Sequence, residues 1–193
     1  MENKIIIRPI RPSDAVEVLE IYRPYIENTN ITFEYTVPPI EEWEKRIQFI
    51  SHQFPWLVAE YKGKIAGYAY ATKHRERIAY SWCCESSVYL SEEFHGKGIA
   101  NMLYEKLFGI LKQQGYINVY AILTSPNPAS EKFHENFGFY DVGRFHKAGF
   151  KFGKWHDTRW MQLHLSRHET PTGSIVAFSE IINSEEVQNI LKS

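Results

Sequence analysis

A predicted strand, a glycine-rich turn and a helix start follow one another without interruption in the middle of this chain. The β-branched and aromatic run at Val88 ends in polar residues, passes through His95-Gly96-Lys97-Gly98 and continues into an apolar-periodic segment from Ile99. Glycine lets the backbone approach a ligand closely, and a helix N-terminus presents unpaired N–H groups with a partial positive charge. The segment Val88–Ala100 therefore predicts a site for a phosphate or pyrophosphate, with an ordinary tight turn as the alternative.

Composition limits what can surround this segment. The chain has 193 residues, enough for one domain with a sizeable core. Its 22 basic and 23 acidic residues give a net charge of −1, which argues against nucleic-acid binding through a basic face. No apolar run approaches the roughly 18 residues needed to cross a bilayer, and the N-terminus lacks the features of a secretory signal. We expect a cytoplasmic protein that binds neither nucleic acid nor membrane.

Residue types that bind metals or form disulfides are unfavourably spaced. Cys83 and Cys84 are adjacent in a predicted strand, so their side chains point to opposite faces and predict neither a disulfide framework nor a metal knuckle. His164 and His168 have the spacing of a helical zinc motif, but they span a predicted strand end and a polar tail. We expect no metal.

Apolar periodicity divides the chain into strands and helices. Strands are expected at 5–7, 56–61, 65–70, about 79–90, 118–123, 140–145 and 158–165, with a turn over 149–155. Helices are expected at about 14–27, 40–52, 99–115 and 129–136. This order predicts an α+β layered fold, in which helices cover both faces of a central mixed, mostly antiparallel sheet.

Residues 166–193 differ in composition from the rest of the chain. Residues 167–173 are polar and typical of a linker, and 175–178 could form a strand. A short capped helix is expected from about Asn183, with Val187, Ile190 and Leu191 on one face. The pattern leaves open whether this tail packs on its own domain or on a partner subunit.

Several motifs in a fixed order resemble a known superfamily. The strand end V-Y-L-S leads into H-G-K-G-I-A, and N-P-A-S-E-K-F-H-E-N-F-G-F follows downstream. Together they resemble the two core motifs of the GCN5-related N-acetyltransferases (GNAT), whose fold has a splayed strand pair. P-W-L-V-A-E at 55–60, A-Y-S-W-C-C-E-S-S-V-Y-L-S at 79–91, F-H-E-N-F-G-F at 133–139 and G-F-K-F-G-K-W-H-D at 149–157 are similar to the phosphinothricin acetyltransferase branch. We therefore expect an acetyltransferase domain at 1–165 and a tail of unknown packing at 166–193.

The resemblance implies transfer of an acetyl group from acetyl-CoA to a small amine. In this family the pantetheine arm inserts beside the first motif like an extra strand, so its amides would pair with the backbone of Val88, Tyr89 and Leu90. The diphosphate would lie on backbone amides of His95, Gly96, Lys97, Gly98, Ile99 and Ala100. His95 replaces the usual Gln or Arg, which leaves the backbone function intact. Asn127 and Ser130 would also contact the cofactor; a turn asparagine before proline is the alternative for Asn127.

Acyl transfer to an amine requires a neutral nucleophile, stabilisation of an oxyanion and a proton for the departing thiolate. By resemblance, Glu85 is the candidate base, and the Val88 N–H is the candidate oxyanion donor. His134 stands where many acetyltransferases have a tyrosine and is the candidate acid. The alternatives are a solvated strand carboxylate for Glu85, an exposed helix histidine for His134, and Tyr104 or Tyr140 as the acid.

The resemblance also indicates where the acceptor binds. The candidates are Phe33, Glu34, Arg77 and Tyr80, followed by Lys73 and Arg75. Arginine suits the oxyanions of amino-acid analogues, whereas Glu34 would repel an acidic acceptor. The leading hypothesis is N-acetylation of a small amino acid or an analogue such as phosphinothricin or methionine sulfoximine. The alternatives are acetylation of a polyamine or a protein N-terminus, and a non-catalytic acyl-CoA-binding sensor. A homodimer is expected by resemblance alone.

Overall fold

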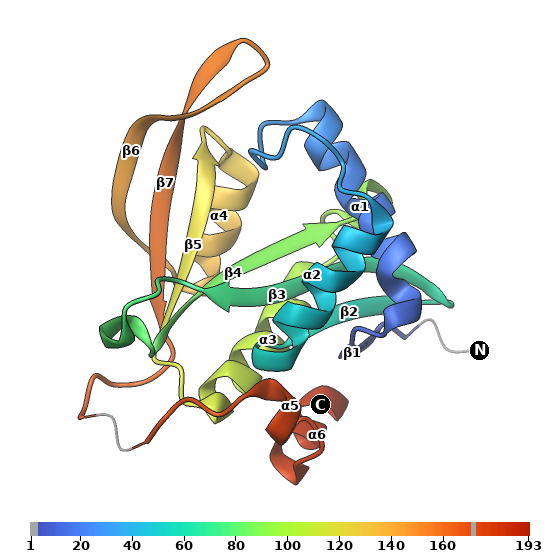
Figure 1. The fold of residues 1–193 in the computed structure, drawn as a ribbon, viewed down its shortest axis with the longest axis vertical. Helices are drawn as coiled ribbons and strands as arrows, with labels where there is room; N and C mark the ends of the chain where they lie inside the picture. The colour runs from blue at the N-terminus through green and yellow to red at the C-terminus, as the bar shows by residue number, and fades with distance from the viewer. Residues whose placement is uncertain (1–3, 171–172) are drawn as a thin grey trace.

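The structure, a computed structural model, describes residues 4–170 and 173–193. A seven-stranded sheet runs through the molecule in the order β1-β2-β3-β4-β5-β7-β6 (Figure 1). One half is antiparallel and consists of β1 (Ile6–Pro9), β2 (Trp56–Tyr61), β3 (Lys64–Lys73) and β4 (Cys83–Leu90). The other half, also antiparallel, consists of β5 (Asn118–Ser125), β7 (Lys154–His164) and β6 (Tyr140–Lys151). A short parallel contact between β4 and β5 joins the halves.

Helices cover both faces of this sheet, as the sequence predicts. The helices α1 (Ala15–Asn28) and α2 (Ile40–Gln53) pack with Trp56, Val58 and Tyr68 in one buried cluster. The helices α3 (Ile99–Gln114) and α4 (Pro128–Phe137) pack against the other face, where Leu57 and Ala69 belong to a second cluster. Alternate residues of β2 and β3 therefore serve opposite cores, because successive strand side chains point to opposite faces.

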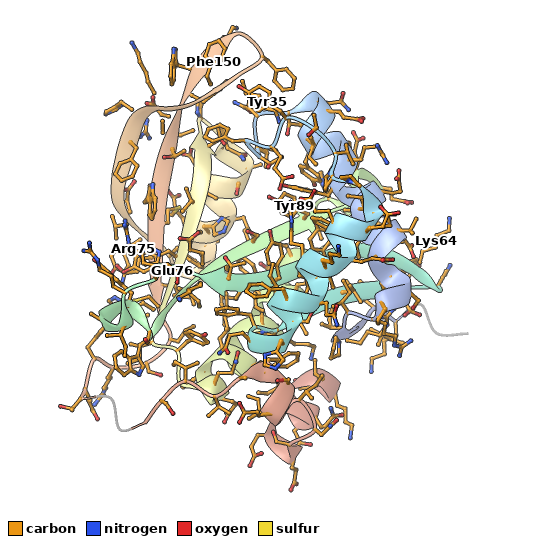
Figure 2. All side chains as sticks on the ribbon, viewed as in Figure 1. Tyr35, Lys64, Arg75, Glu76, Tyr89 and Phe150 are labelled. Carbon is orange, nitrogen blue, oxygen red and sulfur yellow. The ribbon has the colours of Figure 1, made fainter. Side chains whose placement is uncertain are left out.

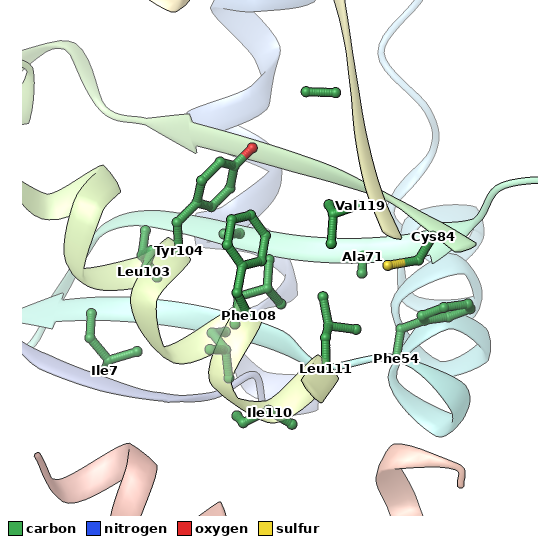
Figure 3. Close-up of a cluster of buried hydrophobic side chains, with 14 of the residues drawn as sticks. Ile7, Phe54, Ala71, Cys84, Leu103, Tyr104, Phe108, Ile110, Leu111 and Val119 are labelled. Carbon is green, nitrogen blue, oxygen red and sulfur yellow. The ribbon is translucent and has the colours of Figure 1, made fainter. Parts of the chain in front are cut away.

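The α3 face holds the larger core. Leu103, Tyr104 and Phe108 project from α3 toward the sheet, where Ala71 and Val119 lie (Figure 3). Small strand residues leave room for these large helix side chains, and dense packing of this kind is the main source of stability in protein interiors. The core therefore holds α3, and with it the glycine turn that precedes α3, firmly against β3 to β5.

The structure corrects the extents of three expected strands. Residues Ile78–Tyr80 form a 3-10 turn, so the strand expected at 79–90 begins only at Cys83. The closing hairpin is longer than expected, because residues 149–151 and 154–156 pair across it. Its turn contains only Phe152 and Gly153, both at positive φ (50° and 73°). Gly149 and Lys151, which indicated a broader turn, are in fact strand residues.

The tail packs on its own domain. The helices α5 (Phe178–Ile181) and α6 (Glu185–Lys192) bury Phe178 and Val187 in the core on the α3 face. Ser184 caps α6 by accepting a hydrogen bond from the Val187 N–H at 3.3 Å. The expected strand at 175–178 is wrong: Val176 is held instead by Gln114, whose Nε2 donates to the Val176 carbonyl at 2.7 Å. Figure 1 shows these helices beneath α3.

Candidate functional site

A gap opens between β4 and β5 in the middle of the sheet. In the described chain these strands pair only over Cys83–Glu85 and Asn118–Tyr120, and β4 then continues to Leu90 beside β3. The Leu90 carbonyl accepts a hydrogen bond from Tyr25 Oη at 2.6 Å, whereas the Ser91 N–H donates to Ala66 of β3. Because backbone groups alternate along an antiparallel strand, those of Ser86, Val88 and Leu90 face the gap. The predicted splayed pair is thus confirmed.

The glycine turn closes one end of this gap. Gly96 and Gly98 have φ values of 73° and 77°, a conformation that L side chains rarely adopt, and a Cβ at either would meet nothing within 4 Å. Gly98 is the N-cap of α3 and has no side chain to accept from the N–H groups of the first turn. Those N–H groups therefore remain available to an anion.

A cavity of about 570 Å³ lies between this turn, the gap and α4. Nine of the eleven predicted cofactor residues line this cavity: Val88, Leu90, His95, Gly96, Gly98, Ile99, Ala100, Asn127 and Ser130. Lys97 and Tyr89 are not among its lining residues: Lys97 Nζ lies 5.1 Å from the Phe94 ring centroid, and the Tyr89 ring stacks edge-on against Tyr22 and Tyr25. By the alternation above, the Tyr89 backbone faces β3 rather than the gap.

Asn127 and a carboxylate that the sequence analysis missed organise the far wall. Asn127 is the N-cap of α4, and its Oδ1 accepts from the Ser130 N–H at 3.3 Å. Glu131 Oε1 accepts from the Asn127 N–H at 3.0 Å and from Ser125 Oγ at 2.9 Å. The hydrogen bond from the Asn127 N–H is the main reason that the pKa of Glu131 is lowered, and the Ser125 hydrogen bond and the Arg159 guanidinium lower it further. An acidic residue in the first turn of a helix was the available signal.

His134 is buried rather than exposed. Its side chain is 2% exposed, and its Nδ1 lies 2.8 Å from the Ser130 carbonyl. Because a carbonyl can only accept, Nδ1 carries the hydrogen and Nε2 of the neutral ring accepts. The partner of Nε2 is Tyr104 Oη at 3.2 Å, and Tyr104 Oη in turn accepts from Ser86 Oγ at 3.3 Å. Burial lowers the pKa of His134 to about 4, so the ring is neutral at physiological pH.

These buried groups border the cofactor side of the gap. A small cavity of about 60 Å³ is lined by Tyr104, His134 and Ser86, and it shares Val88, Asn127 and Ser130 with the larger cavity. Tyr140, the other tyrosine considered as an acid, is exposed and bonds His164 at 2.8 Å on the closing hairpin. The geometry therefore brings Tyr104, and not Tyr140, to the site.

Glu85 stands where β4 and β5 part. It is the last β4 residue paired with β5, opposite Tyr120. His74 Nδ1 donates to Glu85 Oε1 at 2.9 Å, and the His74 ring stacks on Tyr120 with centroids 4.4 Å apart. Burial raises the pKa of Glu85 from its usual value, against the lowering influence of His74. Glu85 is therefore not a freely solvated carboxylate, and His74 is a site residue that the sequence analysis missed.

The predicted acceptor residues fall into two groups. Glu34 Oε1 accepts from Arg46 Nη1 at 2.6 Å, and Phe33 packs on the closing hairpin against Gly149. In the second group, the Tyr80 and His74 rings are T-shaped with centroids 5.8 Å apart, and the Arg75 guanidinium carbon lies 5.7 Å from the Tyr80 ring centroid. Lys73 pairs with Glu76 at 2.6 Å, and Arg77 is exposed. Arg46, in the middle of α2, was not singled out because it resembled an ordinary solvated helix charge.

Within residues 4–170 and 173–193, no group of three or more His, Cys, Asp and Glu side chains is arranged to hold a metal ion. In the same ranges, none of the helices combines the length and the apolar character needed to span a bilayer.

Comparison with known proteins shows what the chain is similar to. A model of the family described as "Acetyltransferase (GNAT) domain" matches residues 7–160. Phosphinothricin N-acetyltransferase of Streptomyces viridochromogenes is 36% identical over 156 residues, which are 81% of this chain and 85% of that protein. An L-methionine sulfoximine/L-methionine sulfone acetyltransferase of Salmonella typhimurium is 29% identical over 86% of this chain and 97% of its own length.

A solved structure has the same fold. It is a GNAT superfamily phosphinothricin acetyltransferase from Sinorhizobium meliloti, in complex with acetyl-CoA. It matches with a TM-score of 0.84 and 34% sequence identity, over 89% of this chain and 95% of that chain.

Proposed function

The chain belongs to the GNAT family of acetyl-CoA-dependent N-acetyltransferases, and we propose that its acceptor is a small amino acid or amino-acid analogue. The analogue would be of the phosphinothricin or methionine sulfoximine type, on which the named relatives act. One observation carries the catalytic part of the proposal: Glu85 stands with His74 at the point where β4 and β5 separate, beside the backbone that faces the gap.

The residues around the gap fit acetyl-CoA. Val88 directs an N–H and a carbonyl into the gap, as an amide-bearing chain laid beside β4 would require. The uncapped first turn of α3 and the two left-handed glycines fit a diphosphate, and the cavity connects both places. When bound, acetyl-CoA supplies an acyl group activated as a thioester. The proposed cofactor residues are therefore those of the sequence analysis, with Val88 central and Tyr89 contributing its side chain to the wall behind.

Glu85 would act as the general base. An ammonium acceptor must lose a proton before it can attack, and a carboxylate takes up that proton directly or through one water. Burial raises the pKa of Glu85, which makes the carboxylate a better proton acceptor than an exposed glutamate. The Val88 N–H, which faces the gap, would donate to the carbonyl oxygen of the acyl group as negative charge develops there.

Tyr104 and His134 would together provide the proton for the leaving thiolate. A histidine with a pKa of about 4 holds no spare proton on Nε2 at neutral pH, so His134 is unsuited to act alone as the acid. The Tyr104 hydroxyl, which lines the small cavity, is the hydrogen-bond donor at this point. In this proposal the Tyr104 hydroxyl donates to His134 Nε2 in the resting site. When the thiolate leaves, the hydroxyl would turn to the sulfur and give up its proton, and the tyrosinate would then recover a proton from solvent.

The acceptor would bind between the α1–α2 loop and the 3-10 turn at 78–80. Pairing of Glu34 with Arg46 offsets the negative charge that was expected to repel an acidic acceptor. Phe33, Arg77 and Tyr80 remain the proposed contacts, and Arg75 joins them because it lies over Tyr80. An arginine there would suit the carboxylate or phosphinyl group of the acceptor.

Two further features belong to the proposal. A homodimer is proposed from the resemblance and from the exposed aromatic side chains of the β6–β7 hairpin. A cytoplasmic location is proposed because Cys83 and Cys84 are free thiols, which stay reduced in that compartment.

The test is CoA release with a panel of acceptors, measured for the parent chain and for Glu85→Gln. The panel contains phosphinothricin, methionine sulfoximine, unmodified amino acids, a polyamine and a peptide with a free N-terminus. We expect release with amino-acid analogues and roughly 10²- to 10⁴-fold slower turnover of Glu85→Gln near neutral pH, the usual contribution of a general base. The deficit should shrink at high pH, where free amine is abundant.

The control is Glu186→Gln, the same chemical change at an exposed position of α6, which should behave like the parent. An equal loss at every pH would contradict the assignment of Glu85 as base. Release only with the polyamine or the peptide would support the alternative acceptors. Binding of acetyl-CoA without release for any amine would contradict the enzyme and favour an acyl-CoA sensor.

A further inference from the structure

We infer that Lys151 is a positioning residue that sets the affinity for the acceptor amine by holding the α1–α2 loop in place. This inference rests on the proposed function, because residues 29–39 of that loop carry Phe33 and Glu34. Lys151 lies near the tip of the β6–β7 hairpin, on an element that the sequence alone does not connect with the loop.

The Lys151 side chain is buried and bonded to the loop. It is 2% exposed, and its Nζ donates to the carbonyls of Ile26 and Thr32, both at 2.8 Å. Ile26 belongs to the last turn of α1, whose carbonyls have no partner within the helix. A buried ammonium group is rare unless it is paired, and here two carbonyls supply the pairing. Lys151 thereby joins the end of α1 to the start of the loop.

A second set of hydrogen bonds continues from the Lys151 backbone. His156 Nε2 donates to the Lys151 carbonyl at 3.0 Å, which leaves His156 Nδ1 to accept from Asn30 Nδ2 at 2.9 Å. The Asn30 carbonyl accepts from Thr124 Oγ1 on β5 at 2.6 Å. The loop is therefore hydrogen-bonded to both strands of the hairpin, through Lys151 of β6 and His156 of β7, and also to Thr124 of β5.

Two aromatic contacts fix the part of the loop that carries the proposed acceptor residues. The Phe33 ring occupies the space beside Gly149, where a Cβ would come within 2.6 Å of Phe33 Cδ2. The Tyr35 hydroxyl donates to the Phe150 carbonyl, and Figure 2 shows these two residues at the upper end of the molecule. A side chain at position 149 would occupy the space of the Phe33 ring. The orientation of Phe33 therefore depends on the backbone of β6 at Gly149.

These contacts act mainly on the acceptor side of the proposed site, and Ile31 of the same loop also lines the cofactor cavity. They hold Asn30, Thr32, Phe33 and Tyr35, whereas the glycine turn and the start of α3 receive none of the hydrogen bonds described above. Loss of the Lys151 ammonium group should therefore loosen the acceptor side and leave the diphosphate and pantetheine contacts in place. A general structural role would instead weaken both sides together.

The experiment compares Lys151→Met with Lys154→Met. The first removes the ammonium group and keeps an unbranched chain in the buried space; the second makes the same change at an exposed position of the same hairpin. We expect the acceptor KM of Lys151→Met to rise about 10-fold or more, because hydrogen bonds to a charged donor are lost. The acetyl-CoA Kd and kcat at saturating acceptor should change by no more than about 3-fold. Lys154→Met should match the parent.

Gly149→Ala reaches the same loop by another route and keeps the inference testable if Lys151→Met does not fold. Its Cβ must displace the Phe33 ring, so the acceptor KM should rise while the acetyl-CoA Kd is retained. An unchanged acceptor KM in the folded variants would overturn the inference, as would a parallel rise in the acetyl-CoA Kd.

A readout without acceptor separates this inference from the proposed function. Hydrogen exchange of residues 29–39 should be faster in Lys151→Met than in the parent and in Lys154→Met. Absence of CoA release from the parent with every amine would reject the proposed function. Unchanged exchange in a folded Lys151→Met would reject the role of Lys151.

Discussion

Opposing effects act on the Glu85 carboxyl group. Burial raises its pKa, whereas the hydrogen bond and charge of His74, and the charge of Arg75, lower it. Burial is the largest of these effects, so the carboxylate forms at a higher pH than it would on an exposed glutamate. Since the proposed base works as the carboxylate, activity should increase as the pH rises through the pKa of Glu85.

The variant His74→Phe should move the acid limb of the pH profile of kcat/KM to higher pH. Phenylalanine keeps a ring against Tyr120 but removes the N–H that donates to Glu85. Because that hydrogen bond lowers the pKa of Glu85, its loss raises the pKa and delays formation of the carboxylate. The measurement is kcat/KM across the acid range, with His52→Phe at an exposed position as the control. An acid limb that stays in place or moves to lower pH would reject the coupling.

The variant Tyr104→Phe tests the proposed proton donor. It keeps the packed ring but removes the hydroxyl between Ser86 and His134, which leaves both without this partner. The cost in unfolding free energy should be about 1–3 kcal/mol, as for other unsatisfied buried polar groups. We expect kcat to fall at least about 10-fold with an unchanged acetyl-CoA Kd, as for loss of a group that acts in the transition state. Tyr140→Phe on the exposed hairpin should keep its kcat, and a normal kcat in Tyr104→Phe would exclude the role.

Elements whose signals lie within their own residues were predicted well. The helix from Ile99 was found because its apolar spacing is helical and glycines bracket it at Gly98 and Gly115. The start of α6 was found because a polar capping segment precedes apolar residues at helical spacing, and Ser184 makes the cap. In both cases local chemistry and tertiary packing favour the same conformation.

The β6–β7 hairpin shows where local reading fails. Its glycines are typical turn residues, yet Gly149 and the neighbouring Lys151 pair with His156 and Lys154 across the hairpin. An irregularity between Phe145 and Gly149 bends β6, and the Asp157 carboxylate supports it by accepting from the Lys147 N–H at 2.8 Å. Gly149 leaves room for the Phe33 ring, and Lys151 donates hydrogen bonds to the carbonyls of Ile26 and Thr32. All three partners are far away in the sequence.

The candidate site divides in the same way. Glu85, Val88, Asn127 and His134 were found through motifs in which the site residues are neighbours in sequence. His74 and Arg46 were missed, because they act through partners 11 and 12 residues away and no short pattern marks such pairs. Tyr104 was considered only as an alternative acid, because its partner His134 is 30 residues away. The exposure of His134 was also unpredictable, because α4 is covered by aromatic residues of α3.

At the scale of the whole molecule, the exposed aromatic residues of the β6–β7 hairpin are typical of an interface with a second subunit. Phe145, Phe150, Phe152 and Trp155 are all exposed, Trp155 by 60%, and β6 is an edge strand of the sheet. Long apolar edge strands are usually covered in soluble proteins. A second copy of the chain would cover this exposed edge strand, and the assembly would be the expected homodimer.

Sedimentation should therefore give twice the mass of one chain. Trp155→Lys should shift the equilibrium toward the single chain, because a charge would then have to be buried at the interface. Phe49→Lys makes the same kind of change at a side chain of α2 that is 82% exposed, and it should leave the dimer intact. A parent protein that sediments as a single chain would rule out the homodimer.

The amino-acid sequence alone determined the layered fold, the glycine turn before α3 and the residues that line the gap in the sheet. These features depend on periodicity, on left-handed glycines and on motifs of adjacent residues, all of which act over a few residues. The tertiary structure decided the protonation and partners of His134 and the burial of Lys151. It also decided that Glu85 pairs with His74 and Glu34 with Arg46. Burial and long-range hydrogen bonds control these properties, and both depend on which distant segments meet when the chain folds.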